Sequence, residues 1–183
     1  IAAGLNNNLL AYELSPSLTL LEESLCKWFA KKIGFNDSSG GIAASGGTLS
    51  NLNALIAARN NAGLGSDPNS VLLVSEDAHS SFIKCTRIMG LDEANLVRIK
   101  TDNKGGMDIQ NLRKTLDKCS IDNKKIFAIV ATLGTTVRGA IDPIKDISEI
   151  CKEKNIWLHI DGSIGGIFAL NNFPIEGLNN INQ

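Results

Sequence analysis

Residues 157 to 166 read Trp157-Leu158-His159-Ile160-Asp161-Gly162-Ser163-Ile164-Gly165-Gly166. This pattern predicts a short buried strand that ends in an acid and is followed by small residues. In open α/β sheets, ligands bind beyond the carboxyl ends of the strands, which is where Asp161 would lie. Asp is also a common turn former at such positions. The role of Asp161 therefore depends on what other segments bring to the same edge of the sheet.

Strand and helix patterns alternate through most of the chain. Apolar runs at 71–75, 96–99 and 126–132 predict three more strands, and helical spacing of apolar residues fills the segments between them. Strands that alternate with helices of about three turns indicate an α/β fold, with a mainly parallel sheet flanked by helices.

Polar residues and prolines predict where these helices begin. We expect Thr48 to be the N-cap of a helix with Leu49, Leu52, Leu55 and Ile56 facing inward, and Asp108 to cap a later helix. Pro143 is expected at the first helical position of the next one.

The first 40 residues differ from the rest. Residues 1–16 are polar and turn-like, and a helix is expected from Leu18, with one apolar stripe that includes Leu21, Leu25 and Trp28. We therefore expect one partial domain, with an N-terminal arm and helix over 1–40 and βα repeats over 41–183. The first residue is not Met and the last residues are polar, so we expect a piece of a longer protein.

Composition narrows the functional classes. The chain is 43% hydrophobic and 20% charged, with a net charge of −1, which gives no reason to expect nucleic-acid or membrane partners. The longest apolar runs are far too short to span a membrane. Four scattered cysteines with no C-x-x-C pair favour reduced thiols in a cytoplasmic protein.

Four features should meet at one edge of the sheet, because the carboxyl ends of parallel strands and the helix N-termini lie on the same side. They are the glycine turn at Gly47 and Thr48, His79 after the strand pattern at 71–75, Thr136 after the strand pattern at 126–132, and Asp161. The glycine turn opens a helix, where free backbone amides favour an anion such as phosphate. His79 is either a simple capping residue or a ring that stacks on a planar ligand.

Two weaker interpretations stay open at this point. His159 and Asp161 form an H-x-D pair that could bind a metal, but the chain has only two histidines and no HExxH motif, so we predict no metal site. His159 is instead expected to position its neighbours. A phosphate-binding module without catalytic activity is the other alternative.

A phosphate cradle, an aromatic ring and a fixed carboxylate together suit a flat, phosphorylated heteroaromatic cofactor. A carboxylate beside a pyridine nitrogen keeps that nitrogen protonated, which makes the ring an electron sink. This is the chemistry of pyridoxal 5′-phosphate.

At these residues the chain resembles the pyridoxal-phosphate-dependent group II amino-acid decarboxylases, which include glutamate, aromatic-amino-acid and diaminobutyrate enzymes. The matching stretches occur in family order and are Ser15–Glu22, Ser45–Asn51, Asp77–Ser81, Ala131–Thr136, Gly139–Ile144 and Trp157–Asp161. The resemblance implies the large domain of the fold-type I pyridoxal-phosphate enzymes, truncated here. It also implies decarboxylation of an L-amino acid by a homodimer.

The resemblance assigns a role to each candidate residue. Gly47 and Thr48 would hold the cofactor phosphate, His79 would stack on the pyridine ring and help to handle protons, and Thr136 would approach the cofactor. Asp161 would pair with the pyridine nitrogen. Ser163 would lie near the ring, at a position that is usually Ala.

The chain departs from the family pattern in two places. Asp161 is followed by Gly162, Ser163 and Ile164, where the family usually has two alanines and an aromatic residue. The family's Schiff-base lysine follows a His beyond the strand-end Asp, and no His-Lys pair follows Asp161 here. We therefore expect this chain to be inactive alone. Other fold-type I enzymes, namely aminotransferases and cysteine desulfurases, are the alternative catalytic classes.

Overall fold

The protein is described by a computed structural model that covers residues 8, 9 and 11–171. The expectations for residues 1–7, 10 and 172–183 lie outside the described residues. Within the described part of the chain, no helix is long and apolar enough to cross a membrane.

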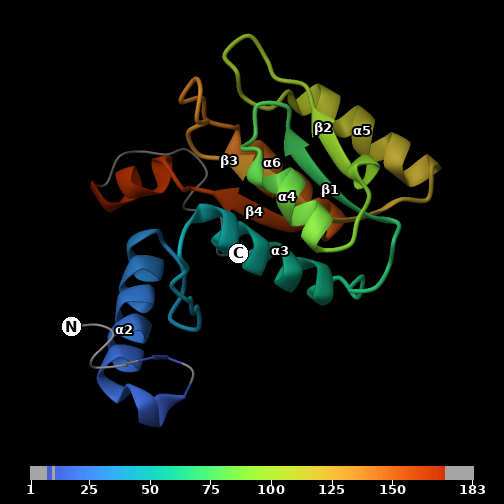
Figure 1. The fold of residues 1–183 in the computed structure, drawn as a ribbon. Coiled ribbons are helices and arrows are strands. Elements are labelled where there is room, and N and C mark those ends of the chain that lie inside the picture. The colour runs from blue at the N-terminus through green and yellow to red at the C-terminus, as the bar shows by residue number, and fades with distance from the viewer. Residues whose placement is uncertain (1–7, 10, 172–183) are drawn as a thin grey trace.

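A parallel sheet forms the centre of the molecule (Figure 1). Its strands in the described residues are β1 (Ser70–Ser75), β2 (Leu96–Ile99), β3 (Lys125–Thr132) and β4 (Trp157–Asp161). They are ordered β2-β1-β3-β4, and each neighbouring pair runs parallel. The strands read as nearly continuous apolar runs because both faces of a parallel sheet are covered. The predicted α/β fold with a mainly parallel sheet is confirmed.

Helices cover both faces of this sheet. The α-helices of the described chain are α2 (Pro16–Lys32), α3 (Gly47–Asn61), α4 (Ser81–Ile88), α5 (Ile109–Ile121) and α6 (Ile144–Lys154), and the short 3-10 turns are η1 (Tyr12–Leu14), η2 (Glu93–Asn95) and η3 (Gly165–Asn171). Leu55 of α3 and Phe82 of α4 pack with Val74 on one face. Leu112 of α5 and Ile147 of α6 pack with strand residues on the other face. Each such buried side chain contributes about 1.5–3 kcal/mol.

The helix N-caps in the structure match the predicted ones only in part. Asp108 caps α5, because its carboxylate accepts the amides of Gln110 at 2.8 Å and Asn111 at 3.1 Å. The expected N-cap at Thr48 is wrong: α3 begins at Gly47, and Gly46 takes the cap position. The reason is that the Gly46 carbonyl already accepts the first helical bonds, from the amides of Leu49 and Ser50.

Two further expectations need correction. Pro143 is the N-cap of α6, one residue before the first helical position. Leu49 and Ile56 do not face inward; they are 41% and 40% exposed, because α3 buries a narrow line that includes Leu55 and Ala58.

Helix α2 lies apart from the helices on the sheet (Figure 1). It begins at Pro16, two residues before the expected start, and its apolar stripe stays largely exposed in this chain. Leu21 is 61% exposed, Leu25 49% and Trp28 48%. The division of the chain at residue 40 stays a prediction.

Candidate functional site

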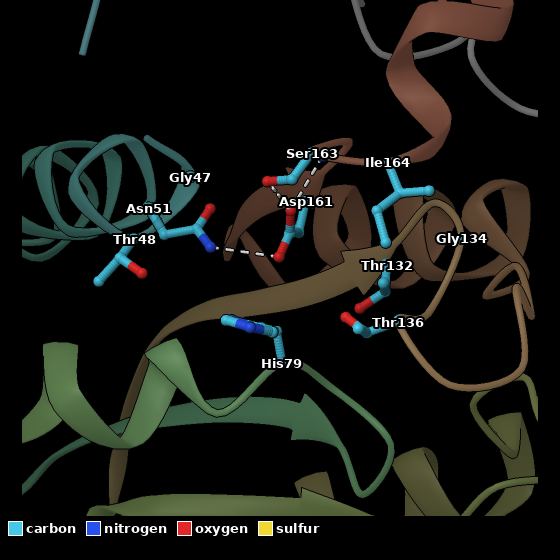
Figure 2. A pocket seen from close by; sticks show the side chains of 10 residues that line it. All are labelled: Gly47, Thr48, Asn51, His79, Thr132, Gly134, Thr136, Asp161, Ser163 and Ile164. Carbon is cyan, nitrogen blue, oxygen red and sulfur yellow. Dashed lines mark hydrogen bonds between the residues drawn. The ribbon is translucent and has the colours of Figure 1, made fainter. Parts of the chain in front are cut away.

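A pocket of about 300 Å³ opens beyond the carboxyl ends of the strands (Figure 2). The chain leaves β1 toward β2 on one side, whereas β3 and β4 extend the sheet on the other, so the strand order reverses between β1 and β3. Such reversals leave a crevice where α/β proteins bind ligands. The pocket is lined by Gly47, Thr48, Asn51, His79, Thr132, Gly134, Thr136, Asp161, Ser163 and Ile164.

All six residues that the sequence singled out line this one pocket. They come from the start of α3, the turn after β1, the loop after β3 and the end of β4. The structure therefore brings them together, while their individual roles stay predictions.

Asp161 lies at the end of β4 and is only 6% exposed. Its Oδ1 accepts the Ser163 hydroxyl at 2.7 Å and the Ser163 amide at 3.1 Å. Its Oδ2 accepts the side-chain amide of Asn51 at 3.2 Å. A carboxylate buried this deeply is costly unless donors surround it. These bonds supply the donors and fix the direction in which the group points.

The start of α3 gives the pocket a place for an anion. The first amides of a helix, here those of Gly47 and Thr48, have no acceptor within the helix and carry partial positive charge. A Cβ at Gly47 would lie 2.6 Å from the Ser163 hydroxyl oxygen, so glycine at this position lets Ser163 approach the start of α3 closely. The free amides at this helix start suit an anion such as phosphate.

His79 lies in the turn that leads from β1 to α4. Its Nδ1 accepts the amide of Ser81, the first residue of α4, at 3.2 Å. In Figure 2 the ring lies beneath the Asp161 carboxylate and forms part of the pocket wall. His79 thus accepts the first amide of α4, whose N-cap is Ser80, and lines the pocket at the same time.

The end of β3 and the loop after it supply hydroxyl groups. Thr132 is 4% exposed, and its Oγ1 is buried with no hydrogen-bond partner among the described residues. Thr136 lines the same wall. A buried hydroxyl without a partner is unusual in a folded protein, so Thr132 is a candidate to bond a ligand in the pocket.

Sequence reasoning missed Asn51 as a site residue. Asn51 lies one helical turn after Gly47, is 4% exposed, and reaches both Asp161 and His159. Its spacing of four residues from Gly47 was the available signal, because residues four apart share one face of a helix. Thr132 was missed as well, since it reads as one more residue of a buried strand.

His159 lies on β4, behind the pocket, and is 8% exposed. Its Nε2 is 3.0 Å from the Asn51 side-chain oxygen. Burial lowers the pKa of His159 to about 4, against the opposing effect of the Asp161 charge. The imidazole is therefore neutral near pH 7. Within the described residues, no three His, Cys, Asp or Glu side chains are grouped so that they could hold a metal ion.

Comparisons with known proteins point to one family. The family model for the pyridoxal-dependent decarboxylase conserved domain matches residues 1–179. The acidic amino acid decarboxylase GADL1 of Xenopus tropicalis is 35% identical over 173 residues, which are 91% of this chain and 34% of that protein. The aromatic-L-amino-acid decarboxylase of Bacillus atrophaeus is 32% identical over 166 residues, 90% of this chain and 34% of that protein. The chain thus spans about a third of these relatives.

Solved structures agree with the sequence matches. Mouse CSAD in its apo form superposes with a TM-score of 0.90 at 29% identity, over 97% of this chain and 40% of that one. Tryptophan decarboxylase of Catharanthus roseus, in complex with L-tryptophan, gives a TM-score of 0.89 at 29% identity, over 98% of this chain and 42% of that one. The fold and the order of its elements are therefore shared with these proteins.

Proposed function

The chain belongs to the pyridoxal-dependent decarboxylase family, and we propose that the full-length protein containing it removes the α-carboxyl group of an L-amino acid with pyridoxal 5′-phosphate. One observation carries this proposal: a buried, rigidly held carboxylate and a helix N-terminus face the same pocket.

The residues present fit this cofactor. The amides of Gly47 and Thr48 suit its phosphate, and the Asp161 carboxylate suits its pyridine nitrogen. The His79 ring suits one face of the pyridine, and the unpartnered Thr132 hydroxyl suits a polar substituent. A pocket of about 300 Å³ is at the lower end of the range for small-molecule sites.

When bound, the cofactor supplies an electron sink for the pair of electrons left on Cα as CO₂ departs. The chain's own residues create the conditions for that chemistry. Asp161 would hold a proton at the pyridine nitrogen, because a fixed carboxylate stabilises the charged ring. The α3 amides would hold the phosphate, and the His79 ring would cover one face of the pyridine. Together these residues would orient the cofactor before the substrate arrives.

Three more features complete the proposal. No lysine lines the pocket within the described residues, and the family resemblance implies a cofactor-bound lysine, so we expect the chain alone to be inactive. The exposed stripe of α2 suits burial in a homodimer. The cysteines are free thiols and three of them are buried, which suits a reducing cytoplasm.

Assays of the full-length protein with pyridoxal phosphate and a panel of acidic and aromatic L-amino acids test the proposal. We expect CO₂ and the matching amine. Asp161→Asn should lower the rate about 100-fold or more, as expected when a preorganised charge is removed. Asp117→Asn, on the exposed face of α5, is the matched control. Products of transamination or desulfuration alone would overturn the proposed reaction, and failure to bind the cofactor would favour a phosphate-binding module.

A further inference from the structure

The two oxygens of Asp161 are held from different parts of the chain. Oδ1 receives both of its donors from Ser163, two residues further along the chain. Oδ2 receives its donor from Asn51, which is 110 residues away in sequence and lies on α3. Rotation of the carboxylate would break bonds on both sides, so the group is fixed by two independent elements.

The count of bonds distinguishes the two oxygens. Each carboxylate oxygen accepts about two hydrogen bonds. Oδ1 already accepts two, from the amide and the hydroxyl of Ser163. Oδ2 accepts one from Asn51 among the described residues and keeps capacity for another. Oδ2 is therefore the oxygen able to accept a bond from a ligand in the pocket.

The orientation of the Asn51 amide follows from its neighbours. A carboxylate only accepts hydrogen bonds, so the NH₂ group of Asn51 must face Asp161, and the amide oxygen must face His159. The Nε2 of His159 then carries the hydrogen and donates it to Asn51. The second amide hydrogen of Asn51 points to the hydroxyl of Ser81, at 3.4 Å. The three side chains form a directional chain from His159 through Asn51 to Asp161.

We propose that Asn51, oriented by His159, is a positioning residue that presents Oδ2 of Asp161 to the pyridine nitrogen of the cofactor. This inference rests on the proposed function, because it assigns the geometry of the same site. The Asn51 amide occupies one of the two acceptor positions of Oδ2 from the protein side. The other acceptor position of Oδ2 then faces the pocket. The Asp161 carboxylate, which only accepts hydrogen bonds, keeps the Asn51 amide from reversing, and the Nε2 hydrogen of His159 matches that orientation.

Asn51→Asp in the full-length protein tests this directly. The substitution keeps the size of the side chain, removes the donor and places a second carboxylate beside Oδ2. Loss of a hydrogen bond to a charged group corresponds to roughly a 10- to 100-fold change in an equilibrium. We therefore expect the cofactor Kd to rise by about that factor, and the absorption band that reports protonation of the ring nitrogen to shift. We also expect kcat to fall more than KM changes. Asn61→Asp, on the exposed last residue of α3, should change none of these.

A second pair of variants separates positioning from general support of the fold. His159→Gln keeps a donor toward Asn51, whereas His159→Leu removes it. The bound-cofactor spectrum of His159→Gln should stay closer to wild type, and that of His159→Leu should shift in the same direction as Asn51→Asp. This pair decides the matter if Asn51→Asp does not fold.

The outcomes separate this inference from the proposed function. If wild-type protein binds no cofactor, the proposed function fails, whatever the variants do. If wild type binds but Asn51→Asp and His159→Leu give its Kd and spectrum unchanged, the positioning role is refuted and the proposed function stands.

Discussion

Replacing Gly47 with alanine should destabilise the folded protein only while Ser163 keeps its hydroxyl. The added Cβ would lie 2.6 Å from the Ser163 oxygen, closer than such atoms approach in real structures. The hydroxyl must turn away and give up its 2.7 Å bond to Asp161. Losing one hydrogen bond to a carboxylate at this partly exposed position costs about 1–2 kcal/mol.

An opposing contribution reduces this cost. Alanine has less conformational freedom than glycine in the unfolded chain, which stabilises the folded state by about 0.5–1 kcal/mol at a compatible helical site. We therefore expect a net loss of roughly 0.5–1 kcal/mol for Gly47→Ala alone. In a Ser163→Ala background the nearest remaining contact is with the Ser163 Cβ, at 3.4 Å. Gly47→Ala should then stabilise the protein by about 0.5 kcal/mol, so the sign of its effect reverses.

Urea unfolding of the wild type, the two single variants and the double variant measures this coupling without cofactor. The expected interaction energy is about 1–2 kcal/mol. Gly40→Ala paired with Ser163→Ala is the control, because a Cβ at Gly40 meets nothing within 4 Å. If the effects of Gly47→Ala and Ser163→Ala add to within about 0.5 kcal/mol, the close approach of the two residues is not a feature of the folded protein.

Other expected outcomes concern the core and pH. Asp142→Ala should lower the free energy of unfolding by about 2–5 kcal/mol in urea melts, because the buried amides of Met107 and Thr132 each lose a carboxylate partner at 2.7 Å; a loss below about 1 kcal/mol would contradict this bracket. Leu73→Ala, at a side chain that is 0% exposed, should cost about 2–5 kcal/mol in the same assay. The pKa of His159 falls from an ordinary 6.5 to about 4 on folding. Between pH 6.5 and pH 4, the imidazole is therefore protonated in the unfolded chain and neutral in the folded chain. Stability should therefore fall as the pH drops from about 6.5 to about 4, by roughly 3 kcal/mol in total from this group, and His159→Gln should show a correspondingly flatter profile.

Much of the fold could be predicted because its signals are local. The runs at 71–75 and 126–132 fall within strands that begin one residue earlier, at Ser70 and Lys125. Asp108 caps α5 as expected, since an N-cap bond joins residues two and three positions apart. Parallel order then follows from the alternation of strands and helices.

Errors occurred where the outcome depends on distant parts of the chain. Helix α3 buries the polar side chains of Asn51 and Arg59 and exposes Leu49 and Ile56. Amphipathic spacing identifies the helix but does not identify which of its faces the sheet covers. The partners of Arg59 are carbonyls at Met89 and in the loop before β1. No pattern within the helix predicts them.

Residues of the candidate site were likewise predictable where local signals place them and not where they depend on distant contacts. The residues at strand ends, among them His79, Thr136 and Asp161, could be predicted because parallel topology alone places them on one edge of the sheet. Asn51 was missed because a polar residue in the second turn of a helix usually faces solvent, and its four-residue spacing from Gly47 is a weak signal by comparison. Its role depends on the exact approach of α3 to β4, which only the folded structure shows.

The bond between Asn51 and Asp161 also has a consequence for how the protein folds. It closes a loop of 110 residues, and loop closure over such distances carries a large entropy cost. Because closing such a loop costs more entropy than forming local contacts, we expect this bond to form after the local helices and their nearest strands. We therefore expect the amides around the pocket to gain protection from hydrogen exchange among the last during refolding. A ligand that binds only the completed pocket would then pull the folding equilibrium forward by mass action.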